Sequence, residues 1–211
     1  MTQKGLGASR GRTSEQKKFK VVLLGDYRCG RTALIITYTT GEYPEYVPLA
    51  FDPVVAVTVF EGQEFELLLL ELGTAGEITD CSRHLSYRDV DVVLICYDVM
   101  SPSSFENVFE KWYPEVKHFC VGVPIILVGC KTDLRSDKDL EEKLRSQGEN
   151  PIKYTEGEEA GRKINAAAYL ECSAKCNENV ENVFREATKQ ALMATRVKDR
   201  VRNRESGCAL L

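Results

Sequence analysis

A short segment near the start of the chain carries the residue types that bind phosphate. Residues 25–32 read GDYRCGRT and follow an apolar run, residues 19–24, that predicts a buried strand. They match the phosphate-loop pattern G-x-x-x-x-G-K-[ST] except at Arg31, a bulkier and planar cation in place of lysine. In such loops backbone N–H groups and a helix N-terminus bind phosphate oxygens, and the Thr32 hydroxyl can ligate Mg²⁺. The predicted phosphate-binding residues are Gly25, Asp26, Tyr27, Arg28, Cys29, Gly30, Arg31 and Thr32, with a ligand-free strand–helix turn as the alternative.

Two further polar segments follow apolar runs later in the chain. They read GCKTD at residues 129–133 and ECSAK at residues 171–175. Ligands of α/β sheets bind at the carboxyl ends of strands. There Asp133 can accept hydrogen bonds from the N1–H and exocyclic amine of guanine, while the stem of Lys131 covers the base and the N–H of Ala174 meets its O6. The predicted guanine-binding residues are Lys131, Asp133, Ser173, Ala174 and Lys175, although each segment alone is also typical of a turn with a helix cap.

The segments that must position these residues alternate between strand-like and helix-like patterns. We predict strands at residues 19–24, 54–60, 65–72, 90–99, 124–130 and 168–172, and helices at residues 32–38, 104–119, 137–147, 158–166 and 179–194. The second and third strands flank a short polar turn, which predicts a hairpin. The fourth is almost continuously apolar, as expected of a central parallel strand that is covered on both faces. The pattern predicts an α/β sheet with right-handed crossovers.

The formal net charge of −4 is unevenly distributed: both ends of the chain are basic, and the residues between them are acidic overall. Residues 1–20 contain six basic residues against one acidic residue, and residues 196–206 contain five against two. The acidic total argues against a general nucleic-acid binder, whereas the basic ends could orient the protein on an anionic surface.

The eight cysteines are best read as reduced thiols. No apolar run in residues 1–18 predicts a signal peptide or N-terminal anchor, and no run approaches the ~20 residues of a membrane-spanning helix. Cys172 and Cys176 are four residues apart, but the two histidines, His84 and His118, give no zinc-binding spacing.

The chain is predicted to have one domain between two polar ends. Residues 1–18 are expected to be disordered, residues 19–195 to form the domain, and residues 196–211 to form a basic tail. The last four residues, CALL from Cys208, form a C-a-a-X signal whose terminal leucine favours geranylgeranylation. The basic tail would supply the second membrane signal that one lipid needs. A coincidental cysteine near the end is the alternative.

From about residue 18 onward the chain resembles the Ras-like small GTPases, and within them the Rho family. The phosphate loop, TAG at residues 74–76 and the two later segments match four family motifs in order. The Rho branch is indicated by LSY at residues 85–87, WYPEV at residues 112–116 and the charged helix predicted at residues 137–147. KTDLR from residue 131 and LICYDV from residue 94 are similar to the Rif and RhoD members.

The resemblance implies a P-loop G domain with a six-stranded, mostly parallel sheet and an insert helix. Its ligands would be GTP, GDP and Mg²⁺, and Gly76 would join the phosphate site. The family's partners would be effectors, exchange factors or a guanine-nucleotide dissociation inhibitor. A monomer is expected on the cytosolic face of the plasma membrane or endosomes, with a cytosolic pool and signalling toward actin. The switch I and effector residues would be Tyr46, Pro48, Leu49, Phe51 and Asp52.

The chain departs from the family mainly where the family hydrolyses GTP. Tyr27 stands where the family has glycine, beside the γ-phosphate and the path of an arginine finger. Leu49 replaces the switch I threonine that ligates Mg²⁺, and Gly73 replaces the switch II aspartate that holds Mg²⁺ through water. Counted without gaps from the hairpin turn, Glu71 falls where that aspartate would be, and it is a candidate replacement.

The water-orienting glutamine of switch II is also missing. Two alignments stay open: Glu77 replaces that glutamine, or the glutamine is deleted and Glu77 is the residue after it. Neither orients water as an amide does, so no catalytic residue is intact and hydrolysis is expected to be strongly impaired. The favoured reading is a nucleotide-binding signalling protein. A conventional cycling GTPase and a nucleotide-free scaffold are the alternatives.

Overall fold

Six strands form one sheet in the order β2-β3-β1-β4-β5-β6. The computed structural model describes residues 17–48, 52–72 and 85–208. Among the strands of these described residues, only the β2–β3 pair is antiparallel, as expected of the predicted hairpin, and the other neighbouring pairs are parallel. The predicted six-stranded, mostly parallel α/β fold is confirmed. The strands are β1 (Lys17–Gly25), β2 (Val54–Phe60), β3 (Gln63–Leu72), β4 (Val92–Asp98), β5 (Ile125–Cys130) and β6 (Ala168–Cys172).

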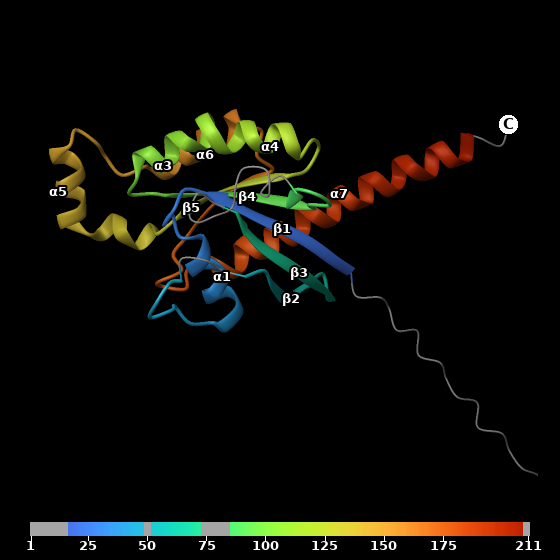
Figure 1. Cartoon of the computed structure of the whole chain (residues 1–211), viewed down its shortest axis with the longest axis horizontal. Helices are drawn as coiled ribbons and strands as arrows, with labels where there is room; N and C mark the ends of the chain where they lie inside the picture. The colour runs from blue at the N-terminus through green and yellow to red at the C-terminus, as the bar shows by residue number, and fades with distance from the viewer. Residues whose placement is uncertain (1–16, 49–51, 73–84, 209–211) are drawn as a thin grey trace, which may run out of the picture.

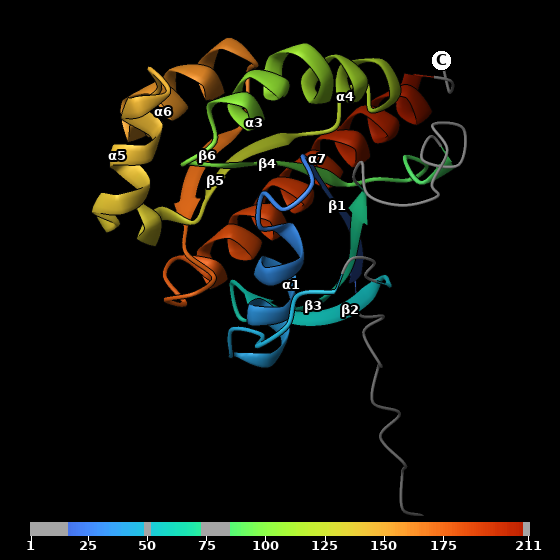
Figure 2. The same cartoon turned by 60° about the vertical axis from the view of Figure 1, so that its left-hand side comes forward.

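Helices cover both faces of this sheet. Figures 1 and 2 show α3, α4 and α6 over one face and α1 and α7 over the other, with α5 beyond the sheet at one end. Within the described ranges, no helix is both long and apolar enough to cross a bilayer. The helical segments are α1 (Arg31–Thr40), α3 (Pro102–Asn107), the π-helical η1 (Val108–Trp112), α4 (Tyr113–Phe119), the 3₁₀-helical η2 (Thr132–Ser136), α5 (Lys138–Ser146), α6 (Tyr154–Lys163) and α7 (Val180–Cys208).

The alternation of side chains along β1 divides the core into two layers. Val21 and Leu23 belong to the cluster that contains Phe184 of α7, whereas Val22 and Leu24 belong to the cluster that contains Trp112. Strand β4 is buried from its first residue to Tyr97, on both faces. Helices on both sides therefore explain why this strand reads as one continuous apolar run.

One predicted helix contains an irregular turn. The helix predicted at residues 104–119 begins at Pro102 and is divided into α3, η1 and α4. Tyr113 N–H bonds to the carbonyl of Val108, five residues earlier. The next residue, Pro114, has no N–H to continue an α-helical ladder, which explains a π-turn at this point.

The last helix is longer than predicted. We expected it to end at residue 194 and to be followed by a basic tail, but α7 continues to Cys208. Residues 195–206 contain no glycine or proline and several strong helix formers, so nothing in them ends the helix. At the other end of the chain, Lys17 and Lys18 already belong to β1. The rest of the predicted disordered extension lies outside the described residues.

Candidate functional site

The parallel strands bring the predicted motifs to one edge of the sheet. Gly25 at the end of β1 is level with Cys96 of β4, and Asp98 at the end of β4 is level with Cys130 of β5. Cys130 is in turn level with Cys172 at the end of β6. The phosphate loop and the two guanine segments therefore leave the sheet side by side, as the sequence predicts.

Glycines permit the tight path of the phosphate loop. Gly25 has φ of +149°, and a Cβ added there would lie 2.3 Å from the carbonyl oxygen of Cys96. Gly30 has φ of +117° and forms the N-cap of α1. A Cβ at Gly30 would lie 3.1 Å from the Cβ of Cys130 and 3.8 Å from the Cε of Lys131, so this loop packs against the guanine segment. Only glycine combines these dihedral angles with such close approach.

Asp26 anchors the loop to the opposite helix layer. Its two carboxylate oxygens accept hydrogen bonds from Asn107 Nδ2 at 2.7 Å and from Trp112 Nε1 at 2.8 Å. The side chain of Asp26 is thus used within the protein, and its contribution to a phosphate site would come from its backbone. Neither Asn107 nor Trp112 was predicted to have this role, although Trp112 is the single tryptophan of the chain.

Arg31 lies in a buried cluster at the end of β3. Its side chain is 3% exposed, and its Nη2 atom lies 3.3 Å from Oε1 of Glu71. Nη1 donates to the carbonyl of Leu72, while Nε is buried with no hydrogen-bond partner in the described part of the chain. The guanidinium predicted to bind phosphate is therefore held by strand β3.

Thr32 contacts the same glutamate. Its hydroxyl donates to Oε2 of Glu71 at 2.7 Å. A hydroxyl has one hydrogen, so this bond leaves its oxygen lone pairs available to a cation. Among the described residues no group of three or more His, Cys, Asp or Glu side chains could hold a metal ion. The hydroxyl and carboxylate nevertheless fit the Mg²⁺ that the resemblance implies, provided that phosphate and water oxygens complete its coordination.

Tyr27 and Arg28 form the exposed tip of the loop. Tyr27 is 45% exposed, and the Arg28 guanidinium carbon lies 6.0 Å from the centre of its ring. Arg28 has φ of +62°, an uncommon value for a residue with a side chain. Two large side chains therefore occupy the tip of the loop, where small residues would leave space above the loop backbone.

The guanine segments are joined by a side-chain hydrogen bond. The buried Ser173 hydroxyl donates to Oδ1 of Asp133 at 2.5 Å and accepts from the backbone N–H of Cys176 at 3.0 Å. These bonds fix the Asp133 carboxylate. Ala174 follows at the start of the turn after β6 and is half-buried, and Lys175 is exposed.

Lys131 crosses between the base site and the phosphate loop. It has a left-handed backbone, with φ of +64°, and its Nζ atom lies 2.7 Å from Oδ2 of Asp98. The ion pair holds the aliphatic stem beside Gly30. Asp98 was not predicted to belong to the site, although its position directly after the apolar part of β4 was a usable signal.

A second side-chain contact, between Arg135 and Glu171, also joins the two predicted guanine segments. Arg135 donates from Nη1 and Nη2 to the two carboxylate oxygens of Glu171, at 2.5 and 2.6 Å. These bonds raise the pKa of Arg135. Tyr169 donates to the same carboxylate and shares a 2.7 Å hydrogen bond with Tyr97. This brace, Arg135 with Glu171, was not predicted, because nothing in the sequence spacing shows which charges meet.

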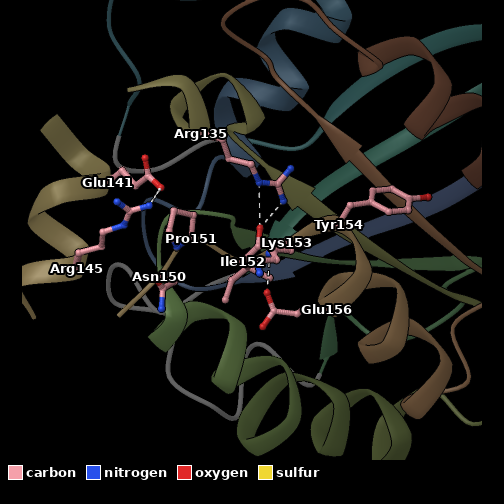
Figure 3. Close-up of a pocket in the computed structure, with 9 residues that line it drawn as sticks. All are labelled: Arg135, Glu141, Arg145, Asn150, Pro151, Ile152, Lys153, Tyr154 and Glu156. Atoms are coloured by element: carbon pink, nitrogen blue, oxygen red, sulfur yellow. Dashed lines mark hydrogen bonds and ion pairs between the residues drawn. The ribbon is translucent and has the colours of Figure 1, made fainter. Parts of the chain in front are cut away.

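A cavity of about 570 Å³ lies beside this brace, between η2, α5 and the start of α6 (Figure 3). Arg135 lines it while donating from Nε to the carbonyl of Ile152 at 3.0 Å. Glu141 and Arg145 of α5 form an ion pair on the opposite wall. Its lining residues all come from residues 135–156, so the cavity is separate from the phosphate loop.

Buried cysteines lie under the phosphate loop. Cys29 is in the loop, and Cys96, Cys130 and Cys172 lie on adjacent strands at the same edge. Burial raises the pKa of the Cys29 thiol to about 12, so it is protonated at neutral pH. These cysteines behave as small apolar residues that let the loop pack closely.

The remaining predicted residues are described only in part. Tyr46 and Asp52 are exposed and Pro48 is half-buried, in the connection between α1 and β2. Cys208 is the last residue of α7. Leu49, Phe51, Gly73, Gly76 and Glu77 lie outside the described residues.

Comparison with known proteins agrees with this geometry. The chain matches the Ras family over residues 20–193. It is 49% identical to human "Rho-related GTP-binding protein RhoF" over 198 residues, covering 93% of this chain and 92% of the relative. Bovine RhoF is 50% identical over 89% of this chain and 87% of its own length, and human RhoD is 48% identical over 83% and 84%. The chain therefore belongs to the Ras family of small GTPases, and within it to the Rho-related GTP-binding proteins.

Proposed function

We propose that this protein is a membrane-anchored Rho-like signalling protein that binds GTP and GDP but hydrolyses GTP poorly. The observation that carries nucleotide binding is the Asp133 carboxylate, which Ser173 fixes at the sheet edge where the phosphate loop begins. Its oxygens can accept from the two donors that guanine presents. A scaffold without nucleotide has no physical need for this arrangement.

Phosphate binding would rely mainly on the loop backbone and the N-terminus of α1. Helix N-termini and turns with successive N–H groups bind phosphate without a side-chain charge. Thr32 and Glu71 are the residues that would serve Mg²⁺, which when bound neutralises phosphate charge. Arg31, the first residue of α1, would add positive charge nearby, where Glu71 and Leu72 hold its side chain against β3.

Impaired hydrolysis follows from the residues around the γ-phosphate position. Tyr27 is large and exposed at the loop tip, where it obstructs both the attacking water and an arginine finger. The sequence also lacks the glutamine that orients this water. An arginine finger raises the hydrolysis rate about 10³–10⁵-fold, equivalent to about 4–7 kcal/mol of transition-state stabilisation. Losing access to it would leave the protein mainly in the GTP form.

A single-turnover assay tests this proposal. Protein loaded with [γ-³²P]GTP is mixed with excess GTPase-activating domain from a Rho regulator, and phosphate release is followed. We expect no more than a few-fold acceleration, with human RhoF as the positive control. Rapid stimulated release would support the alternative, a conventional cycling GTPase.

The membrane partner is proposed from the end of α7, and the protein partners from the connection between α1 and β2. Cys208 would carry a geranylgeranyl group, and Arg196 and Arg200 of α7 would add attraction to anionic lipid. The protein would act at the cytosolic face of the plasma membrane or endosomes, with a cytosolic pool. Effectors would contact the exposed Tyr46 and Asp52, with exchange factors or a dissociation inhibitor as further partners.

A further inference from the structure

We propose that Glu71 is the carboxylate that positions Thr32 toward Mg²⁺ in this chain. The role belongs to a switch II aspartate in the family, and the aligned residue here, Gly73, has no side-chain oxygen. Glu71 lies two residues earlier, on the described part of β3. The inference rests on the proposed nucleotide binding, because phosphate oxygens must complete the metal's coordination.

The sheet places Glu71 beside the phosphate loop. Leu23 of β1 pairs with Glu71 and Leu24 pairs with Leu72, so Glu71 is two residues from the level of Gly25. Its carboxylate turns toward α1, where Oε2 accepts from the Thr32 hydroxyl at 2.7 Å. A carboxylate that approaches from the neighbouring strand thus reaches the metal-binding hydroxyl directly.

This hydrogen bond has a specific consequence for metal binding. The only hydrogen of the Thr32 hydroxyl is held by Glu71, so the oxygen can present its lone pairs to a cation. A carboxylate acceptor also makes the hydroxyl oxygen a better ligand. Partners that orient metal ligands in this way typically change metal affinity 10–100-fold when they are removed.

Arg31 holds the other side of the same carboxylate. Its Nη2 atom lies 3.3 Å from Oε1, while Thr32 uses Oε2. Both carboxylate oxygens therefore have a fixed neighbour, which limits rotation of the Glu71 side chain. The side chain is also 16% exposed, so solvent competes little with these contacts.

The test measures how Mg²⁺ slows the release of a fluorescent nucleotide, mant-GDP. For the unmodified protein we expect release to slow as free Mg²⁺ rises. In E71Q, the Mg²⁺ concentration for half-maximal slowing should rise at least about ten-fold. The matched control is E66Q, the same change on the same strand at a residue paired with Lys18, and it should leave this concentration unchanged.

A double-mutant cycle tests whether Glu71 acts through Thr32. T32A should raise the half-maximal Mg²⁺ concentration, and T32A/E71Q should raise it no further. Full additivity, or an E71Q protein that responds to Mg²⁺ like the unmodified one, overturns the inference. If E71Q fails to fold because buried Arg31 loses its anion, R31Q/E71Q compared with R31Q gives the same answer, because neither variant buries the Arg31 cation.

The outcomes separate this inference from the proposed function. If the unmodified protein retains no mant-GDP at any Mg²⁺ concentration, nucleotide binding itself is refuted. If it retains mant-GDP but Mg²⁺ never alters release, nucleotide binding stands and the role of Glu71 is refuted.

Discussion

The hydroxyl of Ser173 donates to the carboxylate of Asp133 at 2.5 Å, joining the loops that follow β6 and β5. These residues are forty positions apart in the chain, but they follow neighbouring parallel strands. The bond fixes the orientation of the Asp133 carboxylate at the sheet edge. The base specificity of the protein should depend on this carboxylate.

Replacing Asp133 by asparagine should exchange the preferred base. Guanine offers two donors to the carboxylate, whereas xanthine offers a donor and an acceptor, which match the oxygen and nitrogen of an amide. We expect D133N to lose GDP affinity about 100-fold or more and to gain affinity for XDP. Competition against mant-GDP measures both. D139N, on an exposed part of α5, should bind GDP normally, and a D133N protein that still prefers GDP would refute this base site.

The Arg135–Glu171 brace should hold both guanine loops in place. E171Q removes the charge from a bidentate contact whose glutamate side chain is only 12% exposed. We expect a loss of about 1–3 kcal/mol in unfolding free energy and faster nucleotide release that Mg²⁺ does not correct. Urea unfolding and mant-GDP release measure these effects.

The control for this prediction is E141Q. Glu141 pairs with Arg145 one turn later on α5, at the surface. Such pairs contribute only about 0.3–0.5 kcal/mol, so E141Q should change neither stability nor release measurably. Equal effects of E171Q and E141Q would show that the brace has no special role.

Gly157 lets α6 pack directly over the tyrosine pair behind the base site. A Cβ at this position would lie 2.1 Å from Tyr169 Oη and 2.5 Å from Tyr97 Oη. G157A should therefore destabilise the protein by about 1–3 kcal/mol, even though alanine favours a helix. T155A, at an exposed position of the same helix, is the control. An unchanged melting temperature for G157A would show that the tyrosines move aside without cost.

Membrane association should depend on the last cysteine. C208S removes the only thiol that a C-a-a-X signal can modify, so the variant should move to the soluble fraction of cells. C176S removes an exposed cysteine that lies outside the C-a-a-X signal, and this variant should remain membrane-bound. Fractionation with immunoblotting distinguishes the two. C208S that stays on membranes would exclude prenylation as the anchor.

The sequence predicted the sheet well because apolar strands carry a strong signal. The structure gives β2 and β6 the predicted bounds, and β4 is shorter than its apolar run by only a few residues. Helix ends were less predictable. Helix α6 begins at Tyr154, four residues before the predicted start, where the Glu156 carboxylate accepts a hydrogen bond from the backbone N–H of Lys153 at 2.8 Å.

The site was predicted at the level of loops but not of side-chain directions. Chain order and strand ends indicated that the phosphate loop and guanine segments meet. The same residues did not show that Arg31 turns to β3 or that Asp26 is held by Trp112, because these contacts depend on packing between distant segments. Alignment alone does not decide whether Glu71 replaces the family's switch II aspartate. Its hydrogen bond to Thr32 favours a role at the phosphate site.

The most direct test of a nucleotide-binding but poorly hydrolysing protein is the identity of its bound nucleotide. The protein would be purified gently in Mg²⁺ and denatured, and the released nucleotide identified by chromatography. We predict close to one GTP per protein, with little GDP. Stoichiometric GDP would contradict impaired hydrolysis, and a protein that is empty and cannot be loaded with GTP would contradict nucleotide binding altogether.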